Sequence, residues 1–203
     1  KFDDFTESGL NRYLRFLRVT EGLEEKTVQK QYTMLKWFIT WAVRKEYTKQ
    51  DYILRYKVKF KILQKPVIFL TKEELLKVYN YQIPANQSKV KLHKYNGEEY
   101  TKKVEEAGAI AKTRDLFCFC AFTSLRYSDM AQLKRSDIIG DVMYITTQKT
   151  NDRLPINLNS FAKAILDKYK DCQFPGDLAL PVISNQKMNH YLKDLCELCE
   201  INE

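Results

Sequence analysis

Apolar residues recur at helical spacing in two stretches near the start of the chain. The first stretch follows Thr6, a typical N-cap residue, and the second runs from about Lys26 to Arg44. The second stretch also carries Trp37, Phe38 and Trp41, which we expect to widen its buried face. The apolar positions are Leu10, Tyr13, Leu14 and Leu17 in the first stretch, and Val28, Tyr32, Leu35, Ile39, Ala42 and Val43 in the second.

The period of the pattern changes after a short third helix predicted at residues 51–56. Lysine alternates with apolar residues from Lys57 to Leu63, and this period of two is typical of an extended chain, in which successive side chains point to opposite sides. The pattern therefore predicts an extended strap with one cationic edge. Pro66 ends the strap, and we place a domain boundary there, between domains 1–66 and 67–203. The cationic edge consists of Lys57, Lys59 and Lys61.

The rest of the chain mixes predicted helices with two predicted strand pairs. Thr71 and Glu74 form a capping-box pattern before a helix that ends near Tyr81. Asn96-Gly97 between strand-like runs predicts a β-hairpin, with an irregular loop as the alternative. A second strand pair is predicted at 142–147 and 153–158. The other predicted helices are 111–125, which should be buried, 128–134 with Ser128 as its cap, and two that begin at Asn159 and Ser184. The predicted fold class is mainly α with small β-hairpins (α+β).

Composition narrows the class of protein. Gly and Pro together contribute only 11 of 203 residues, and 44% of the residues are hydrophobic, which excludes collagen-like, low-complexity and disordered chains. The formal net charge is +8, which favours a polyanionic partner, although a solvated basic surface would give the same total. Residues 1–66 hold 15 Lys and Arg against 8 Asp and Glu, a net charge of +7. The positive charge is therefore concentrated in the first predicted domain.

The five cysteines are interpreted as reduced thiols. Their odd number and the absence of a signal-like or membrane-spanning segment favour a cytoplasmic location. Cys196 and Cys199 have the spacing of a metal or redox pair, but no second pair at similar spacing accompanies them. We expect core or surface thiols and no metal site.

Candidate chemistry is concentrated in the segment from Thr123 to Asp129. The patterns of a phosphate-binding loop, a serine nucleophile elbow and a zinc-binding helix are all absent from the sequence. Instead, an apolar helix ends in Arg126, and Asp129 is near enough to orient its guanidinium. A fixed, planar cation suits a phosphate whose charge grows in a transition state. The alternative is an ion pair with a purely structural role.

A lysine follows at the tip of the second predicted strand pair. Lys149 lies in the segment Thr146-Thr147-Gln148-Lys149-Thr150. A lysine on such a turn is usually only solvated. If the turn faces a scissile phosphate, Lys149 can instead donate a proton to the leaving alkoxide.

The ordered combination of these motifs resembles the tyrosine-family site-specific DNA recombinases of phages and mobile elements. The resemblance rests on Thr123–Asp129, Lys149-Thr150 and Leu154–Leu158, with Lys26–Val43 similar to the family's helical core-binding domain and Phe69–Leu75 similar to the opening of its catalytic domain. It implies a SAM-like helical domain followed by a truncated recombinase catalytic domain, which together close around duplex DNA. Ser124 departs from the glycine that the family often has.

The resemblance also implies roles for individual residues. A tyrosine would attack a backbone phosphate to give a 3′-phosphotyrosyl intermediate, without a metal or nucleotide cofactor. Arg126 and Lys149 correspond to the catalytic arginine and to the hairpin lysine that acts as general acid, and Asp129 to the supporting acid. The expected partners are double-stranded DNA and further copies of the full-length protein, as dimers or tetramers, with no membrane. The DNA-binding candidates are Lys26, Lys30, Lys36, Arg44, Arg55, Lys57, Lys59, Lys61 and Thr150.

Part of the family pattern is missing after the hairpin. His190 and Lys193 have the spacing of the family's His-x-x-Arg box, but they lie on an apolar-periodic helix and no tyrosine follows them. We therefore interpret His190 as a helix-surface histidine. The expectation is a fragment that binds DNA but cannot cleave it. The alternatives are a non-catalytic helical DNA-binding module and a basic protein-interaction domain. The salt dependence of duplex binding would distinguish the protein-interaction domain from the two DNA-binding hypotheses.

Overall fold

The computed structural model describes residues 5–49, 51–94, 96–147 and 152–201. The chain divides into two compact units, residues 1–68 and residues 69–203, and each has its own hydrophobic core. Within the described residues, no helix is both long and apolar enough to cross a membrane.

The first unit is a helical hairpin. Thr6 caps α1 (Glu7–Arg15) by accepting a hydrogen bond from the backbone N–H of Gly9, as the sequence predicts. One π-helical turn, η2 (Phe16–Thr20), continues α1, and α2 (Glu25–Arg44) and α3 (Tyr52–Arg55) follow. The apolar stripes of α1 and α2 meet in a core to which α3 contributes one fully buried side chain. Its buried members are Leu10, Leu14, Leu17, Val28, Tyr32, Ile39 and Ile53.

Residues 57–61, called the lysine strap below, leave this unit without regular secondary structure. Val58 and Phe60 pack against the core of the first unit, whereas the three lysines between and beside them are exposed. This alternation confirms the predicted extended strap with one cationic edge. The alternation ends at Ile62 and Leu63, which are both exposed.

The second unit is built on helices. Thr71 and Glu74 form the predicted capping box at the start of the first of them. Asn159 and Ser184 cap the last two, also as predicted. The helices are α4 (Lys72–Asn80), α5 (Ala107–Thr123), α6 (Tyr127–Met130), α7 (Ser160–Lys168) and α8 (Asn185–Leu198), with 3₁₀ turns η3 (Arg135–Asp137) and η4 (Pro175–Asp177).

Two small antiparallel sheets accompany these helices. The first is the predicted hairpin of β1 (Lys89–His93) and β2 (Glu99–Lys103), with Gly97 at a positive φ of 83° in its turn. The second has the strand order β3-β4-β5. Its long strands, β4 (Val142–Thr146) and β5 (Arg153–Asn157), are the predicted pair. Strand β3 (Ile138–Ile139) was not predicted, because two residues are too few to show a period.

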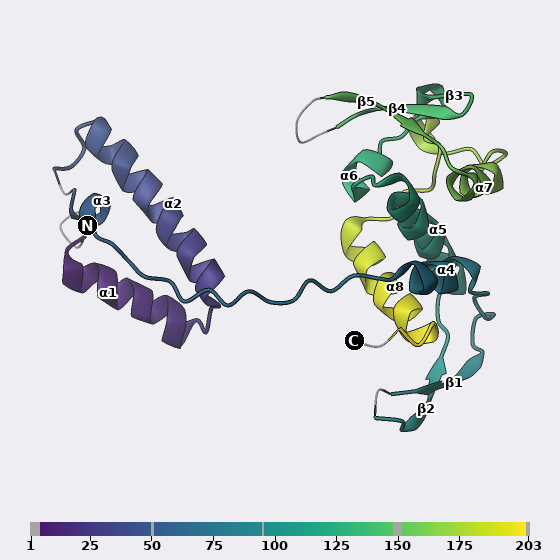
Figure 1. Cartoon of the computed structure of the whole chain (residues 1–203), viewed down its shortest axis with the longest axis horizontal. Coiled ribbons are helices and arrows are strands. Elements are labelled where there is room, and N and C mark those ends of the chain that lie inside the picture. Colours follow the sequence, from purple (N-terminus) through teal and green to yellow (C-terminus); the bar gives the residue numbers. More distant parts are fainter. Residues whose placement is uncertain (1–4, 50, 95, 148–151, 202–203) are drawn as a thin grey trace. The chain divides into compact units, whose positions relative to one another are not determined.

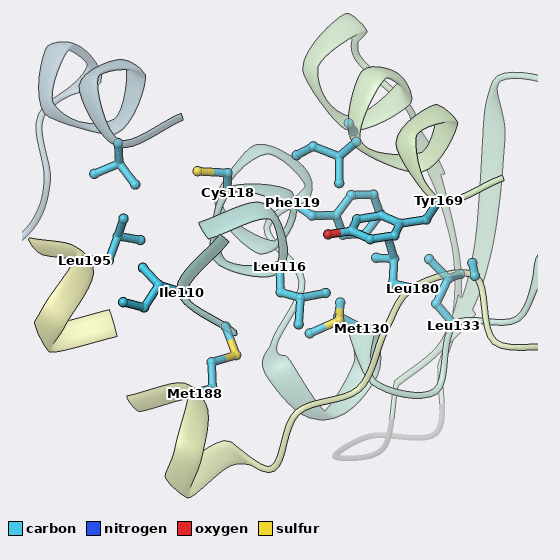
Figure 2. Close-up of a cluster of buried hydrophobic side chains, with 14 of the residues drawn as sticks. Ile110, Leu116, Cys118, Phe119, Met130, Leu133, Tyr169, Leu180, Met188 and Leu195 are labelled. Carbon is cyan, nitrogen blue, oxygen red and sulfur yellow. The ribbon is translucent and has the colours of Figure 1, made fainter. Parts of the chain in front are cut away.

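Helix α5 lies at the centre of the second unit (Figure 1), in contact with α4, α7 and α8. Figure 2 shows the core around it, to which α6, α7 and α8 also contribute side chains. The predicted burial of this helix is confirmed on most of its surface. Its largest fully buried side chains are Ile110, Leu116 and Phe119.

A buried carboxylate joins α5 to α7. Asp115 accepts hydrogen bonds from Nε and Nη2 of its neighbour Arg114, at 3.0 and 2.8 Å. From α7 and its C-cap it accepts bonds from the Lys168 ammonium and from the Tyr169 hydroxyl, the latter at 2.7 Å. Burial and this hydrogen bond to Asp115 raise the pKa of Tyr169, which keeps the phenol protonated. Asp115 therefore holds two helices together with its charge compensated by two cations.

Replacing this carboxylate should weaken the second unit strongly. Asp115→Ala leaves the largely buried guanidinium of Arg114, the exposed ammonium of Lys168 and the buried hydroxyl of Tyr169 without this acceptor, and we expect it to lower the free energy of unfolding by about 3 kcal/mol. Urea denaturation followed by circular dichroism measures this loss. The control is Asp141→Ala, because Asp141 makes an exposed ion pair with Lys163, and this variant should lose less than about 1 kcal/mol. Equal losses in the two variants would contradict the assignment.

Candidate functional site

Arg126 occupies the corner between α5 and α6. Helix α5 ends at Thr123, and Ser124 adopts the left-handed conformation, with φ 58° and ψ 21°. Arg126 is the extended N-cap residue of α6. A helix is present here, but its predicted cap at Ser128 and its predicted end near residue 134 are wrong, because the helix begins at Tyr127 and ends at Met130. The left-handed residue turns the chain so that α6 can start with only three residues between it and α5.

Arg126 and Asp129 form a loose ion pair. Nη1 of Arg126 lies 4.0 Å from Oδ2 of Asp129, and the exposed fractions of the two side chains are 63% and 3%. The carboxylate is thus fixed in the protein interior, while most of the guanidinium faces solvent. Such a pair biases the direction of the cation and leaves its hydrogen-bond donors accessible to an anion.

Hydrogen bonds on both sides fix the backbone of this corner. The carbonyl of Phe122, in the last turn of α5, accepts a bond of 2.9 Å from Nδ2 of Asn159. The Tyr127 hydroxyl donates to the carbonyl of Ile183, in the segment before α8. Residues on both sides of Arg126 are therefore held by hydrogen bonds to two segments distant in sequence.

The second candidate catalytic residue, Lys149, and the DNA-binding candidate Thr150 lie outside the described residues. The structure describes the two strands that lead to them. Their last paired residues are Thr146 and Arg153, and the Arg153 guanidinium lies 5.2 Å from the ring centroid of Tyr144. The hairpin itself is therefore present, and the position of Lys149 relative to Arg126 stays a prediction.

The basic candidates of the first unit are mostly exposed. Those on α2 and the strap present their side chains to solvent, except that Lys36 is half-buried. Arg55 forms an ion pair of 2.7 Å with Asp51 on the same short helix. The exposed candidates are Lys26, Lys30, Arg44, Arg55, Lys57, Lys59 and Lys61.

The prediction that Trp37, Phe38 and Trp41 widen the buried face of α2 is wrong. All three are exposed, and Trp37 has an exposed fraction of 70%. The helical period explains the exposure of Trp37. This residue lies seven positions, or about two turns, from both Lys30 and Arg44, so the three side chains lie on the same side of the helix. The aromatic residues therefore share the solvent-facing side of α2 with two candidate DNA-binding cations.

The remaining titratable candidates, His190 and the cysteines, lie apart from Arg126 in sequence and are not activated as nucleophiles or bases. His190 is exposed and its Nε2 lies 3.8 Å from Oδ2 of Asp194, as expected for a helix-surface histidine. Burial raises the pKa of Cys118 and Cys120 to about 12 and that of Cys199 to about 11, which keeps these thiols protonated. Among the described residues, no group of three or more His, Cys, Asp or Glu side chains is arranged to hold a metal ion.

Comparison with known proteins finds a domain model similar to the first unit and solved structures similar in fold to the chain. Residues 1–62 match the family model of the phage integrase SAM-like domain. The chain is similar to a crystal structure of a lambda integrase (75–356) dimer bound to a COC′ core site, with a TM-score of 0.69 and 16% identity over 98% of this chain and 67% of that chain. A lambda integrase tetramer bound to a Holliday junction gives a TM-score of 0.68 and 16% identity over 97% and 52%. No curated protein matches the sequence.

These findings confirm the predicted fold class. The chain is mostly helical with small antiparallel sheets; residues 1–62 match a phage-integrase SAM-like domain, and the fold of the chain is similar to that of the lambda integrase structures. At 16% identity the structural likeness shows the fold. The chain spans between 52% and 67% of the length of these two lambda integrase chains.

Because Ser124 has a left-handed conformation, replacing it by glycine should stabilise the protein. Ser124→Gly should raise the free energy of unfolding by up to about 1 kcal/mol, because glycine adopts a positive φ without the strain imposed by a Cβ atom. Ser128→Gly is the matched control. Ser128 lies inside α6, where glycine should lower stability by about 0.5–1 kcal/mol. Thermal denaturation measures both changes, and a destabilising Ser124→Gly would contradict the strain at this corner.

Proposed function

We propose that this chain binds duplex DNA in a tyrosine recombinase and contributes Arg126 and Lys149 to phosphoryl transfer in site-specific recombination or integration. The observation that carries the proposal is the coincidence of two independent features. The phage-integrase SAM-like match covers residues 1–62, and the same part of the chain holds most of the net positive charge. In this proposal residues 1–66 are the core DNA-binding domain and residues 67–203 the N-terminal part of the catalytic domain.

DNA binding would depend mainly on phosphate contacts by the first unit. Neighbouring lysines of the strap are two residues apart, which corresponds to about 6.6 Å along an extended chain. A DNA strand carries a phosphate about every 3.4 Å along the helix axis, so this spacing is comparable to that of alternate phosphates. Such contacts are independent of sequence and position the protein on the duplex. The other cations of α2, including the half-buried Lys36, would add to the positive electrostatic potential of this unit.

Arg126 would act on the phosphate that reacts. In the proposed step, a tyrosine oxygen forms a bond to phosphorus, the bond from phosphorus to the 5′-oxygen breaks, and Lys149 donates a proton to that oxygen. The exposed guanidinium of Arg126 would neutralise the charge that grows on the non-bridging oxygens, and buried Asp129 would orient it. This chemistry needs no metal or nucleotide cofactor.

The tyrosines that follow the hairpin are poor candidates for the nucleophile. Tyr169 is buried and its hydroxyl donates to Asp115, and the hydroxyl of Tyr191 donates to Glu106. Burial raises the pKa of Tyr169, and the hydrogen bond to Glu106 raises the pKa of Tyr191. A nucleophile, in contrast, is activated by a lowered pKa or by an adjacent base. We therefore propose that this chain binds DNA without cleaving it. The same observation favours the second candidate function, a non-catalytic helical DNA-binding module.

Self-association on DNA is a further part of the proposal. The similar lambda integrase structures are a dimer bound to a core site and a tetramer bound to a Holliday junction. We propose corresponding assemblies for the whole recombinase that contains this chain.

The strap lysines should determine the salt dependence of DNA binding. Replacing Lys57, Lys59 and Lys61 by glutamine should reduce the slope of log affinity against log salt by about 2.7, because each phosphate contact contributes about 0.9. Fluorescence anisotropy with a labelled short duplex of arbitrary sequence measures the slope. The control replaces three exposed lysines of the β1–β2 hairpin, Lys89, Lys91 and Lys103, which changes the net charge equally. Equal effects of the two triple variants would show that only total charge matters.

Arg126 should affect the reaction more than the binding. In the whole recombinase, Arg126→Ala should reduce strand cleavage by at least about 100-fold, as does the loss of a single transition-state donor in other enzymes, and retain most of the DNA affinity. A suicide duplex that traps the covalent intermediate measures cleavage. Arg12→Ala removes an exposed arginine of the first unit and should leave cleavage in place. Normal cleavage by Arg126→Ala would refute the proposed role.

A further inference from the structure

The lysine strap is attached to the helical unit by its apolar residues. The ring of Phe60 lies 5.8 Å from that of Tyr32 on α2, measured between centroids. On the same ring, the guanidinium carbon of Arg18 lies 6.0 Å from the Phe60 centroid, at the outer limit of a cation–π contact. Phe60 therefore packs against an aromatic ring from one helix and a cation from the turn η2.

The cation that contacts Phe60 is itself fixed. Nε and Nη2 of Arg18 donate to the two carboxylate oxygens of Glu25, at 2.5 and 3.1 Å. The hydrogen bond from Arg18 lowers the pKa of Glu25, and the backbone N–H of Lys61 contributes a smaller effect in the same direction. Glu25 thus connects the start of α2 to Arg18.

The beginning of the strap is attached in a similar way. The Tyr32 hydroxyl donates to the carbonyl of Tyr56 at 3.1 Å, and the Tyr56 hydroxyl donates to Oδ1 of Asn11 at 2.6 Å. The strap is therefore anchored at Tyr56 and again at Phe60, with Lys57 and Lys59 between the two anchors.

These anchors determine which side chains of the strap face solvent. Successive side chains of an extended chain point to opposite sides, so that a shift of one residue would exchange the two sides. With Val58 and Phe60 packed on the core, the lysines must point outward. If Phe60 left its position, no hydrogen-bonded ladder with a neighbouring strand would hold this register, because the described residues of the strap form none.

We propose that Phe60 and Arg18 are positioning residues for DNA binding: they fix the register in which the lysine strap presents its three cations to the phosphates of a DNA strand. Arg18 acts through Phe60 and Glu25 and does not itself contact a phosphate. This inference rests on the proposed function, because it assigns the geometry of the same DNA-binding surface.

A double-mutant cycle tests the inference in the complete chain. Phe60→Ala is made in the native background and in the background with Lys57, Lys59 and Lys61 replaced by glutamine, and affinity for the short duplex is measured in both. Phe60→Ala should weaken binding by about tenfold and reduce the salt slope in the native background, and change affinity by less than about twofold in the glutamine background. The same fold-loss in both backgrounds would overturn the proposal, because Phe60 would then act independently of the strap lysines.

Three further measurements separate positioning from general stability. Arg18→Gln, a milder change at a half-buried side chain, should show the same dependence on background even if Phe60→Ala does not fold. Phe60→Leu should restore most of the affinity, and Phe16→Ala, an exposed phenylalanine outside this core, should leave it unchanged. Trypsin cleavage after the strap lysines should be faster in Phe60→Ala and in Arg18→Gln than in the native chain, and an unchanged rate in both would contradict positioning.

The outcome of the cycle also distinguishes the two proposals. If the glutamine substitutions alone leave affinity and salt slope unchanged, the DNA-binding role of the strap fails, and the positioning role fails with it. If the glutamine substitutions weaken binding and Phe60→Ala adds its full effect to them, DNA binding by the strap holds and only the positioning role is refuted.

Discussion

The buried carboxylate of Asp115 is the constraint on which the second unit depends. It joins α5 to the C-terminal end of α7, and Asn159, the N-cap of α7, binds the carbonyl of Phe122 at the other end of α5. The two helices are thus antiparallel, and both ends of α7 are connected to the C-terminal half of α5. Because Arg126 follows directly after α5, its location depends on these two connections as much as on its own ion pair with Asp129.

Much of the fold could be predicted because local chemistry determines it. Thr6, Thr71, Asn159 and Ser184 begin helices as their side chains predict, and the turn at Gly97 joins two strands as expected. Strand β3 was missed because two residues are too few to show a period, although it pairs locally with β4 across Gly140 and Asp141. The start of α6 was misplaced because Ser128-Asp129 has the composition of a cap, whereas the left-handed Ser124 starts the helix earlier.

The candidate site divides along similar lines. The proximity of Arg126 and Asp129 follows from their spacing of three residues, and the outward direction of the strap lysines from a period of two. The anchors of the strap could not be predicted from the sequence, because Arg18, Tyr32 and Phe60 meet only after the helices of the first unit have folded together. The exposure of Trp37 was misjudged because hydrophobicity was considered without the helical angle, which places this residue with Lys30 and Arg44.

The exposed aromatic residues of α2 have a practical consequence. Trp37 and Trp41 are the only two tryptophans in the sequence, and both lie on the solvent-facing side of one helix in the first unit. Light absorbed selectively by indole is therefore emitted from that helix alone, and the second unit does not contribute. The protein thus carries a native optical reporter that is confined to one of its two units and responds directly to whatever approaches the outer face of α2.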